Sequence, residues 1–278
     1  MKYVEYTNIT EGCGIGNQFR ALFGAYMLSK YLGREFYTTN KWVGKLFNSE
    51  FYKSESISGS NIVIKNKEII FEYIDSEEYS NIDVIKINGG TDIMEYLKND
   101  NPEKLMNMTN NIQYLKYASV ELSKILGEFK ENVIEEVYKK VSFGIKDEFT
   151  TVQFRSFYDV GNKNMDNIQH FIEYCDEKLG VYTGLNIFIT SDNKIATKKI
   201  KDRLSKKHKI HTTETLIKHS ANDYSLDSVS DWILMSTSNS IISSGTSYAK
   251  VAAFLSKCDL FIKNKSNEGY VFDVINAI

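Results

Sequence analysis

Short apolar runs alternate with amphipathic helical patterns along the chain, most regularly in its second half. The β-rich runs there predict strands at 149–157, 185–192, 209–213 and 240–244. Apolar residues at helical spacing predict helices at 165–180, 193–208, 225–239 and 246–256. Strands that alternate with helices in this way predict a mostly parallel, doubly wound α/β sheet.

The first half shows the same mixture of elements with one longer helical stretch. It predicts strands at 34–40, 61–74 and 83–88, and helices at 18–32 and 111–141. The charged end of the long helix and the segment that follows it predict a domain boundary. We therefore expect two domains, 1–145 and 146–278, each long enough to bury its own core.

Composition and charge exclude several classes of protein. A hydrophobic content of 42% is ordinary for a soluble globular protein, and a formal charge of -2 gives no general reason to expect nucleic acid as a partner. No run of 18 apolar residues occurs and the first residues do not resemble a signal peptide, so we expect a cytoplasmic protein without a transmembrane segment. Cys13, Cys175 and Cys258 lie far apart, which indicates neither a disulfide framework nor a zinc site.

A glycine-rich segment, GCGIGN, stands before the first predicted helix. Gly12, Gly14 and Gly16 with Asn17 can form a tight turn whose backbone N–H groups face an anion such as a phosphate. The dinucleotide-binding pattern G-x-G-x-x-G is not met, because Asn17 occupies the third glycine position. NAD binding is therefore a weak alternative, and a purely structural turn stays open.

Ligands of open parallel sheets bind beyond the carboxyl ends of the strands, and this rule selects three loops. The first follows VQFRSFYD and holds Arg155 and Asp159, which a plain ion pair would also explain. The second begins at Asp192. The third is SSGTS at 243–247, where free amides and an N-cap hydroxyl can bind an anion or simply cap a helix.

Four ordered segments resemble a known family: GCGIGNQFRALFGAYMLSKYLGREF, VQFRSFYD, IFITSDN and DWILMSTSNSIISSGTSYAKVAAF. They are similar to segments of the GDP-fucose-dependent fucosyltransferases, above all the α-1,6 enzymes of the N-glycan core and of nodulation factors. The protein O-fucosyltransferases and the plant cell-wall fucosyltransferases resemble them less closely. The resemblance implies a GT-B architecture, in which two Rossmann-like doubly wound domains face a cleft. It assigns the acceptor to 1–145 and the nucleotide sugar to 146–278.

The resemblance also implies roles for particular residues. Arg155 matches the arginine that grips the donor diphosphate in a His-x-Arg-Arg-x-Asp motif, with Gln153 in the place of the histidine. Asn17 matches a functional asparagine of the O-fucosyltransferases. Asp192 and Asp231 match acids that contact the nucleoside or the sugar, and Asp231 is the better match for the guanine edge, although it could instead be a helix N-cap. The other donor-binding matches are Gly14, Gly16, Gly245, Thr246, Ser247 and Tyr248.

Elementary chemistry agrees with these roles. Sugar transfer leaves a nucleoside diphosphate, so donors aimed at the leaving oxygen are the largest catalytic contribution. Arg155 and the amides after Gly245 would supply them, because a planar guanidinium binds phosphate bidentately. No Asp-x-Asp follows a predicted strand, so we expect neither a metal nor another cofactor. Asp159 or Asp166 can deprotonate the acceptor, unless an oxocarbenium-like route needs little help from a base.

The sequence therefore predicts an inverting, metal-independent glycosyltransferase that moves L-fucose from GDP-fucose to a glycan hydroxyl. Two alternatives stay open. One is a related transferase that uses another nucleotide sugar, and the other is a catalytically inactive relative that binds the nucleotide sugar or a glycan.

Overall fold

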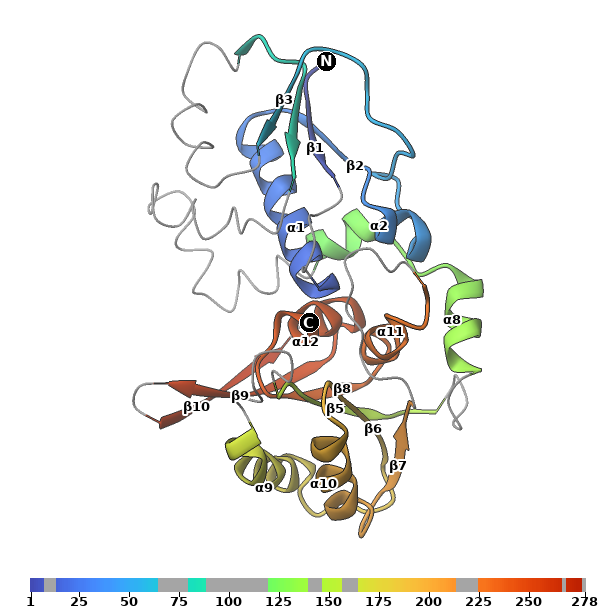
Figure 1. Cartoon of the computed structure of the whole chain (residues 1–278), viewed down its shortest axis with the longest axis vertical. Coiled ribbons are helices and arrows are strands. Elements are labelled where there is room, and N and C mark those ends of the chain that lie inside the picture. The colour runs from blue at the N-terminus through green and yellow to red at the C-terminus, as the bar shows by residue number, and fades with distance from the viewer. Residues whose placement is uncertain are drawn as a thin grey trace. The chain divides into compact units, whose positions relative to one another are not determined.

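The computed structural model describes residues 1–7, 14–64, 80–88, 120–139, 147–156, 165–213, 225–266 and 269–276. These residues divide into two compact units, one up to Lys130 and the other from Glu131 on. Each unit holds its own sheet and its own buried core (Figure 1). The predicted boundary between 145 and 146 lies outside the described residues, and the acceptor and donor roles of the two domains stay predictions.

The first unit is built on a four-stranded parallel sheet with the order β2-β1-β4-β3. Its strands are β1 (Tyr3–Tyr6), β2 (Glu35–Thr38), β3 (Asn61–Ile64) and β4 (Val84–Ile87). Strand β1 pairs on both sides, and Val4, Glu5 and Tyr6 are each 0% exposed. The strands predicted at 34–40 and 83–88 are confirmed, and so is the start of the strand predicted at 61–74.

Two helices accompany this sheet. Helix α1 (Ile15–Tyr31) packs against β1 and β2 and buries Phe19, Leu22 and Leu28. Helix α2 (Lys41–Leu46) was not predicted, because six residues are too few to show a helical period. Asn40 starts it as the N-cap, with Oδ1 accepting from the amide of Trp42 at 2.9 Å.

The single long helix predicted at 111–141 is wrong. Of its described residues, 120–126 form one helix and α8 (Glu131–Tyr138) forms another. Gly127 ends the first of these with a φ of +72°, a left-handed conformation typical of helix C-termini. Phe129 then stacks on Phe47 with ring centroids 4.5 Å apart, and this tertiary contact stabilises the break between the two helices.

The second unit contains a six-stranded sheet with the order β10-β9-β8-β5-β6-β7. Its strands are β5 (Thr150–Phe154), β6 (Asn186–Ser191), β7 (Lys209–Thr212), β8 (Ser240–Ser243), β9 (Asp259–Ser266) and β10 (Gly269–Asn276), of which only β10 is antiparallel to its neighbour among the described strands. The chain builds outward from β5 through β6 to β7 and then returns to β8 on the other side of β5. The carboxyl ends of β5 and β8 are therefore the switch point at which doubly wound sheets bind ligands.

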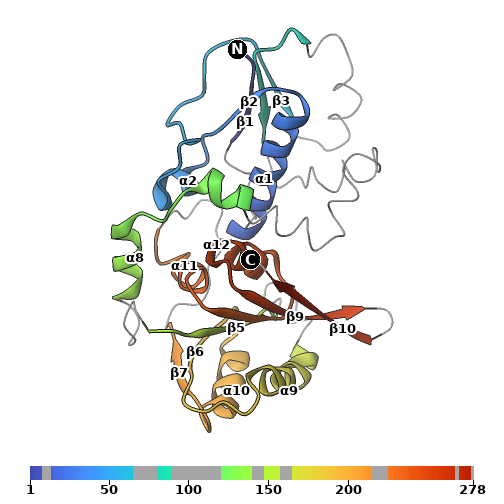
Figure 2. The same cartoon turned by 180° about the vertical axis from the view of Figure 1, so that it is seen from behind.

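Helices cover both faces of this sheet (Figures 1 and 2). Helices α9 (Ile168–Leu179) and α10 (Lys194–Leu204) lie on one face, and α11 (Ser230–Met235) and α12 (Ser247–Ser256) lie on the other. Phe154 of β5 packs on Phe171 of α9, with ring centroids 5.1 Å apart, inside one buried apolar cluster. This arrangement confirms the predicted doubly wound α/β class, whereas the facing of two domains across a cleft stays a prediction.

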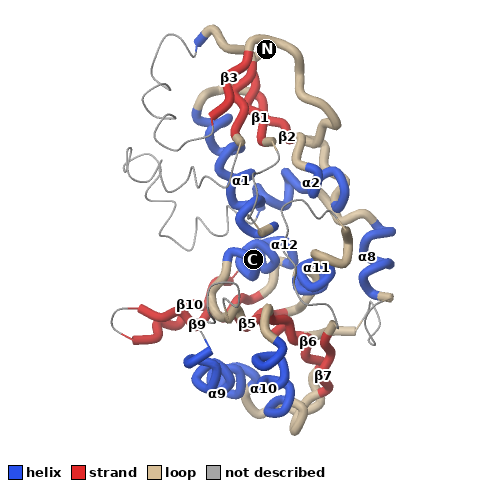
Figure 3. Tube along the Cα trace, viewed as in Figure 1, coloured by secondary structure: helices blue, strands red, loops and turns tan. Residues whose placement is uncertain are grey.

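Two features of the second unit differ from the prediction. The helix predicted at 225–239 is shortened to α11, which ends where the Ser236 hydroxyl donates to the Trp232 carbonyl at 2.8 Å. Strands β9 and β10 form a hairpin at the edge of the sheet that was not predicted (Figure 3). In the described part of the chain, no helix is long and apolar enough to span a membrane.

Candidate functional site

Side-chain hydrogen bonds tie together the carboxyl ends of β5 and β8. The Oε1 atom of Gln153, on β5, accepts from Ser243 Oγ at 2.7 Å and from Thr246 Oγ1 at 3.2 Å. Gln153 is 2% exposed, so its amide is a buried bridge from β5 to the start of α12. Gln153 therefore holds the 243–247 loop in place, and its contact with a donor stays a prediction.

Arg155 follows β5 and pairs with Asp192, which follows β6. Its Nη1 lies 2.9 Å from Asp192 Oδ2. The other carboxylate oxygen accepts from the Ser156 amide at 2.7 Å, and the Arg155 amide donates to Ser244 Oγ at 2.9 Å. The Asp192 side chain is 5% exposed and that of Arg155 is 25% exposed. A buried carboxylate thus orients the guanidinium at the switch point, and a guanidinium has five N–H donors, more than this pair uses.

Asp231 lines a cavity of about 500 Å³ at the ends of β6 and β7. Its Oδ2 accepts from Thr190 Oγ1 at 2.8 Å, and its Oδ1 accepts from the Thr213 hydroxyl. Burial raises the pKa of Asp231 to about 6, and the two hydroxyls oppose that rise. Because Asp231 lies in the first turn of α11, with Val229 at the N-cap position, the alternative that it caps this helix is wrong.

Tyr248 lies close to Asp231, because the indole N–H of the neighbouring Trp232 donates to the Tyr248 carbonyl at 3.2 Å. The tyrosine is 8% exposed, and burial raises the pKa of its hydroxyl well above the ordinary value. The negative charge of Asp231 raises this pKa further, while the positive charge of Arg155 lowers it. Thr190 and Asp192 stand two residues apart at the end of β6, where Thr190 bonds to Asp231 and Asp192 pairs with Arg155, so Arg155 and Asp231 belong to one site.

The loop from Gly245 to Ser247 joins β8 to α12. Gly245 has a φ of +89°, which only glycine adopts readily, and its amide donates to Ser243 Oγ at 3.0 Å. Thr246 is the N-cap of α12, with Oγ1 accepting from the Ala249 amide at 3.1 Å, and Ser247 is the first helical residue. Since the Gly245 amide bonds within the loop, the amides of Thr246 and Ser247 are the better candidates for binding a phosphate.

Of the tight turn expected at Gly12, Gly14, Gly16 and Asn17, the described residues from Gly14 on already begin α1, and an anion-binding role for the segment stays a prediction. Gly14 is the N-cap, with a φ of -64°. Gly16 and Asn17 lie in the first helical turn, and the Asn17 side chain is exposed. The amides of Asn17 and Gln18 donate to the Gly14 carbonyl at 3.0 and 3.1 Å, so they are used by the helix rather than aimed at an anion. Gly12 lies outside the described residues.

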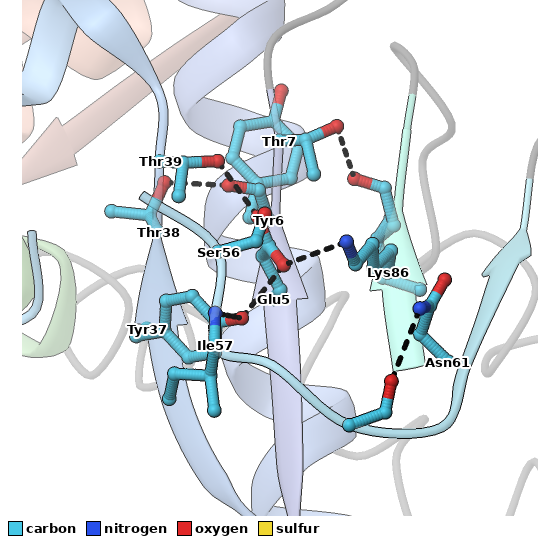
Figure 4. Close-up of polar contacts among 12 residues, drawn as sticks. Glu5, Tyr6, Thr7, Tyr37, Thr38, Thr39, Ser56, Ile57, Asn61 and Lys86 are labelled. Atoms are coloured by element: carbon cyan, nitrogen blue, oxygen red, sulfur yellow. Dashed lines mark hydrogen bonds and ion pairs between the residues drawn. The ribbon is translucent and has the colours of Figure 1, made fainter. Parts of the chain in front are cut away.

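A buried carboxylate in the first unit was missed by the sequence analysis (Figure 4). Glu5 is 0% exposed and lies opposite Tyr37 of β2 and Lys86 of β4. It accepts from the hydroxyls of Tyr37 at 2.7 Å, Ser56 at 2.7 Å and Thr39 at 2.9 Å, and Lys86 Nζ lies 3.8 Å away. Burial, followed by the bond to Glu5, raises the pKa of Tyr37. The glutamate within the apolar run YVEY could have indicated a buried carboxylate. Its hydroxyl partners could not have been predicted, because they depend on the register of the strands.

Asp159 and Asp166 are the candidate bases for deprotonation of the acceptor. Asp159 lies outside the described residues, and Asp166 is exposed in a 3₁₀ turn at Met165–Asn167. Within the described ranges, no group of three or more His, Cys, Asp or Glu side chains is arranged to hold a metal ion.

No family model matches the chain, and no curated protein matches it by sequence. Solved structures match over nearly the whole chain. A mutant of Arabidopsis thaliana FUT1 in complex with GDP aligns with a TM-score of 0.64 at 12% identity, over 99% of this chain and 74% of its own. Fucosyltransferase NodZ from Bradyrhizobium aligns with a TM-score of 0.58 at 11% identity, over 99% and 98%. POFUT1 in complex with GDP-fucose aligns with a TM-score of 0.51 at 10% identity, over 92% and 94%.

The chain has a fucosyltransferase fold. This finding agrees with the resemblance seen in the four sequence segments and confirms the predicted Rossmann-like α/β class, whereas the GT-B arrangement of two domains about a cleft stays a prediction. A shared fold does not by itself give the activity, which is argued next from the site.

Proposed function

We propose that this chain is a glycosyltransferase that transfers L-fucose from GDP-fucose to a hydroxyl group of a glycan. Structures of the same fold were solved with GDP in FUT1, after soaking with GDP-fucose in NodZ, and with GDP-fucose in POFUT1. The observation that carries the proposal is the Arg155–Asp192 pair, which follows β5 and β6 and lies two residues along the chain from the Thr190 hydroxyl that bonds to Asp231. A guanidinium held by a carboxylate can donate hydrogen bonds to a diphosphate, and a buried carboxylate can accept hydrogen bonds from the N–H groups of a nucleobase.

Arg155 stabilises the charge that develops on the diphosphate as the bond to the sugar breaks. Asp192 fixes the guanidinium before the reaction, so little reorganisation is needed when charge appears. The amides of Thr246 and Ser247, at the N-terminus of α12, add a second set of donors. In this proposal the guanidinium and the helix supply the positive charge that a metal ion supplies in other transferases.

Asp231 recognises guanine. A carboxylate has about four acceptor sites, and the hydroxyls of Thr190 and Thr213 use two of them. The remaining sites can accept from N1–H and from the 2-amino group of guanine, and these charge-assisted bonds are strong in a buried cavity. Uracil offers a single N–H between two carbonyls, so UDP should bind poorly.

Transfer proceeds by one displacement, in which the acceptor oxygen attacks the face opposite the diphosphate and inverts the anomeric centre. Asp159 or Asp166 takes the proton of the acceptor, or proton loss follows an oxocarbenium-like transition state. We assign Asn17, exposed in the first turn of α1, to contact with the donor. A glycan acceptor and a cytoplasmic location complete the proposal.

The test is GDP release from GDP-fucose with a panel of glycan acceptors, measured for wild type and for Arg155→Ala. Wild type should release GDP and form an inverted product, and the variant should lose about 100-fold or more of the turnover. Preferential turnover of a different nucleotide sugar would support the alternative donor. Tight binding of GDP-fucose without turnover on any acceptor would support an inactive relative.

A further inference from the structure

The cavity at Asp231 has a second wall to which no role has yet been given. Lys194, Lys198 and Lys201 of α10 line it together with Asp231. Their spacing of four and three residues places them on one face of the helix. Within the described part of the chain, no ion pair joins any of the three ammonium groups to a carboxylate. The cavity therefore combines one buried acceptor group with a row of cationic donors.

A ligand that fits this cavity presents hydrogen-bond donors on one edge and acceptors beside them. Guanine does so, because N1–H and the 2-amino group adjoin the carbonyl oxygen O6. Lysine is a common partner of guanine O6 in protein complexes with nucleic acid. Adenine presents the opposite pattern, with an amino group in the place of O6 and an unprotonated N1. Its N1 cannot donate to Asp231, and its amino group cannot accept from a lysine.

We propose that Lys198 donates to O6 of guanine and that α10 thereby selects guanine over adenine. The inference rests on the proposed function, since it names a second base contact in the same site. Lys198 is the central residue of the row. Side chains on a helix lean toward its N-terminus. Because α10 begins at the carboxyl end of β6, the Lys198 side chain leans toward that end of the cavity. Thr190 and Asp231 lie at the same end.

The experiment measures the affinities of GDP and ADP by displacement of a fluorescent GDP analogue. Lys198→Met should weaken GDP binding about tenfold, as expected for one charge-assisted hydrogen bond, and should change ADP binding less than about twofold. Lys199→Met is the matched control, because Lys199 is exposed on the same helix and does not line the cavity. Circular dichroism and thermal unfolding should show both variants folded.

Two results would overturn the assignment. An equal loss for GDP and ADP would place Lys198 against the phosphates, which both nucleotides share. Unchanged GDP affinity in Lys198→Met would remove this lysine from base recognition, and the triple variant with Lys194→Met and Lys201→Met would then show whether any part of the row contributes. A wild-type protein with no affinity for GDP is a different outcome, because it would overturn the proposed function itself.

Discussion

Asp231→Asn should make the protein more stable and at the same time weaken its binding of GDP. In the folded chain the Asp231 carboxylate is 6% exposed, and burial disfavours its ionised form. An isosteric amide carries no charge and still has an oxygen that accepts from the Thr190 or Thr213 hydroxyl. The substitution therefore removes a cost of folding while it removes acceptor sites for guanine.

The size of the effect follows from the pKa of Asp231, which rises from 3.8 to about 6 in the folded protein. One pKa unit corresponds to 1.36 kcal/mol, so the ionised carboxylate costs about 3 kcal/mol of stability at pH 8. The stability linked to its protonation is fully present below about pH 4 and is lost as the pH rises through about 6. The gain from Asp231→Asn should thus reach about 1–3 kcal/mol at pH 8 and vanish near pH 4.

Urea denaturation at pH 4 and pH 8, followed by tryptophan fluorescence, measures this gain, and calorimetry measures GDP affinity. Asp202→Asn is the matched control, because it makes the same change on the exposed surface of α10. GDP affinity should fall by about 1–3 kcal/mol in Asp231→Asn, and wild-type affinity should fall as the pH drops below about 6.

Lower stability of Asp231→Asn than of wild type at pH 8 would refute the reasoning about buried charge. A stabilised variant with unchanged GDP affinity would refute only the role of Asp231 in binding guanine. The two halves of the prediction can therefore fail separately.

Other predictions concern the remaining groups. Arg155→Lys keeps a charge but loses the planar fork, so kcat should fall about 100-fold or more in steady-state assays, and near-normal turnover would remove Arg155 from the mechanism. Asn17→Ala should lower turnover without lowering Tm, whereas full activity would leave the start of α1 a structural role only. Turnover should persist in EDTA, and a loss that manganese or magnesium restores would indicate a metal-assisted transferase. Glu5→Gln should cost about 1–3 kcal/mol of unfolding free energy while leaving GDP affinity unchanged, and an unaltered Tm would contradict the role given to the buried network.

The parts of the site that the sequence predicted are those that depend on strand ends. Arg155 and Asp192 each follow an apolar run, and parallel strands bring their carboxyl ends to one edge of the sheet. The same rule located the loop at 243–247. Alternation of strands and helices was enough to predict the doubly wound sheet of the second unit.

Features that depend on tertiary contacts could not be predicted in this way. The partners of Glu5 come from three separate segments, and only the register of β1, β2 and β4 places Tyr37 and Lys86 beside it. The break after Gly127 is stabilised by the stacking of Phe129 on Phe47, which helical periodicity does not reveal. The lysines that line the cavity were not singled out in the sequence, because only the packing of α10 against β6 places them beside Asp231.

Isothermal titration of the wild-type protein with GDP and with UDP tests the central claim most directly. The account predicts that GDP binds at least about tenfold more tightly than UDP, because Asp231 meets two donors on guanine and one on uracil. Binding of UDP as tight as that of GDP, or no binding of GDP, would contradict the assignment of GDP-fucose as the donor.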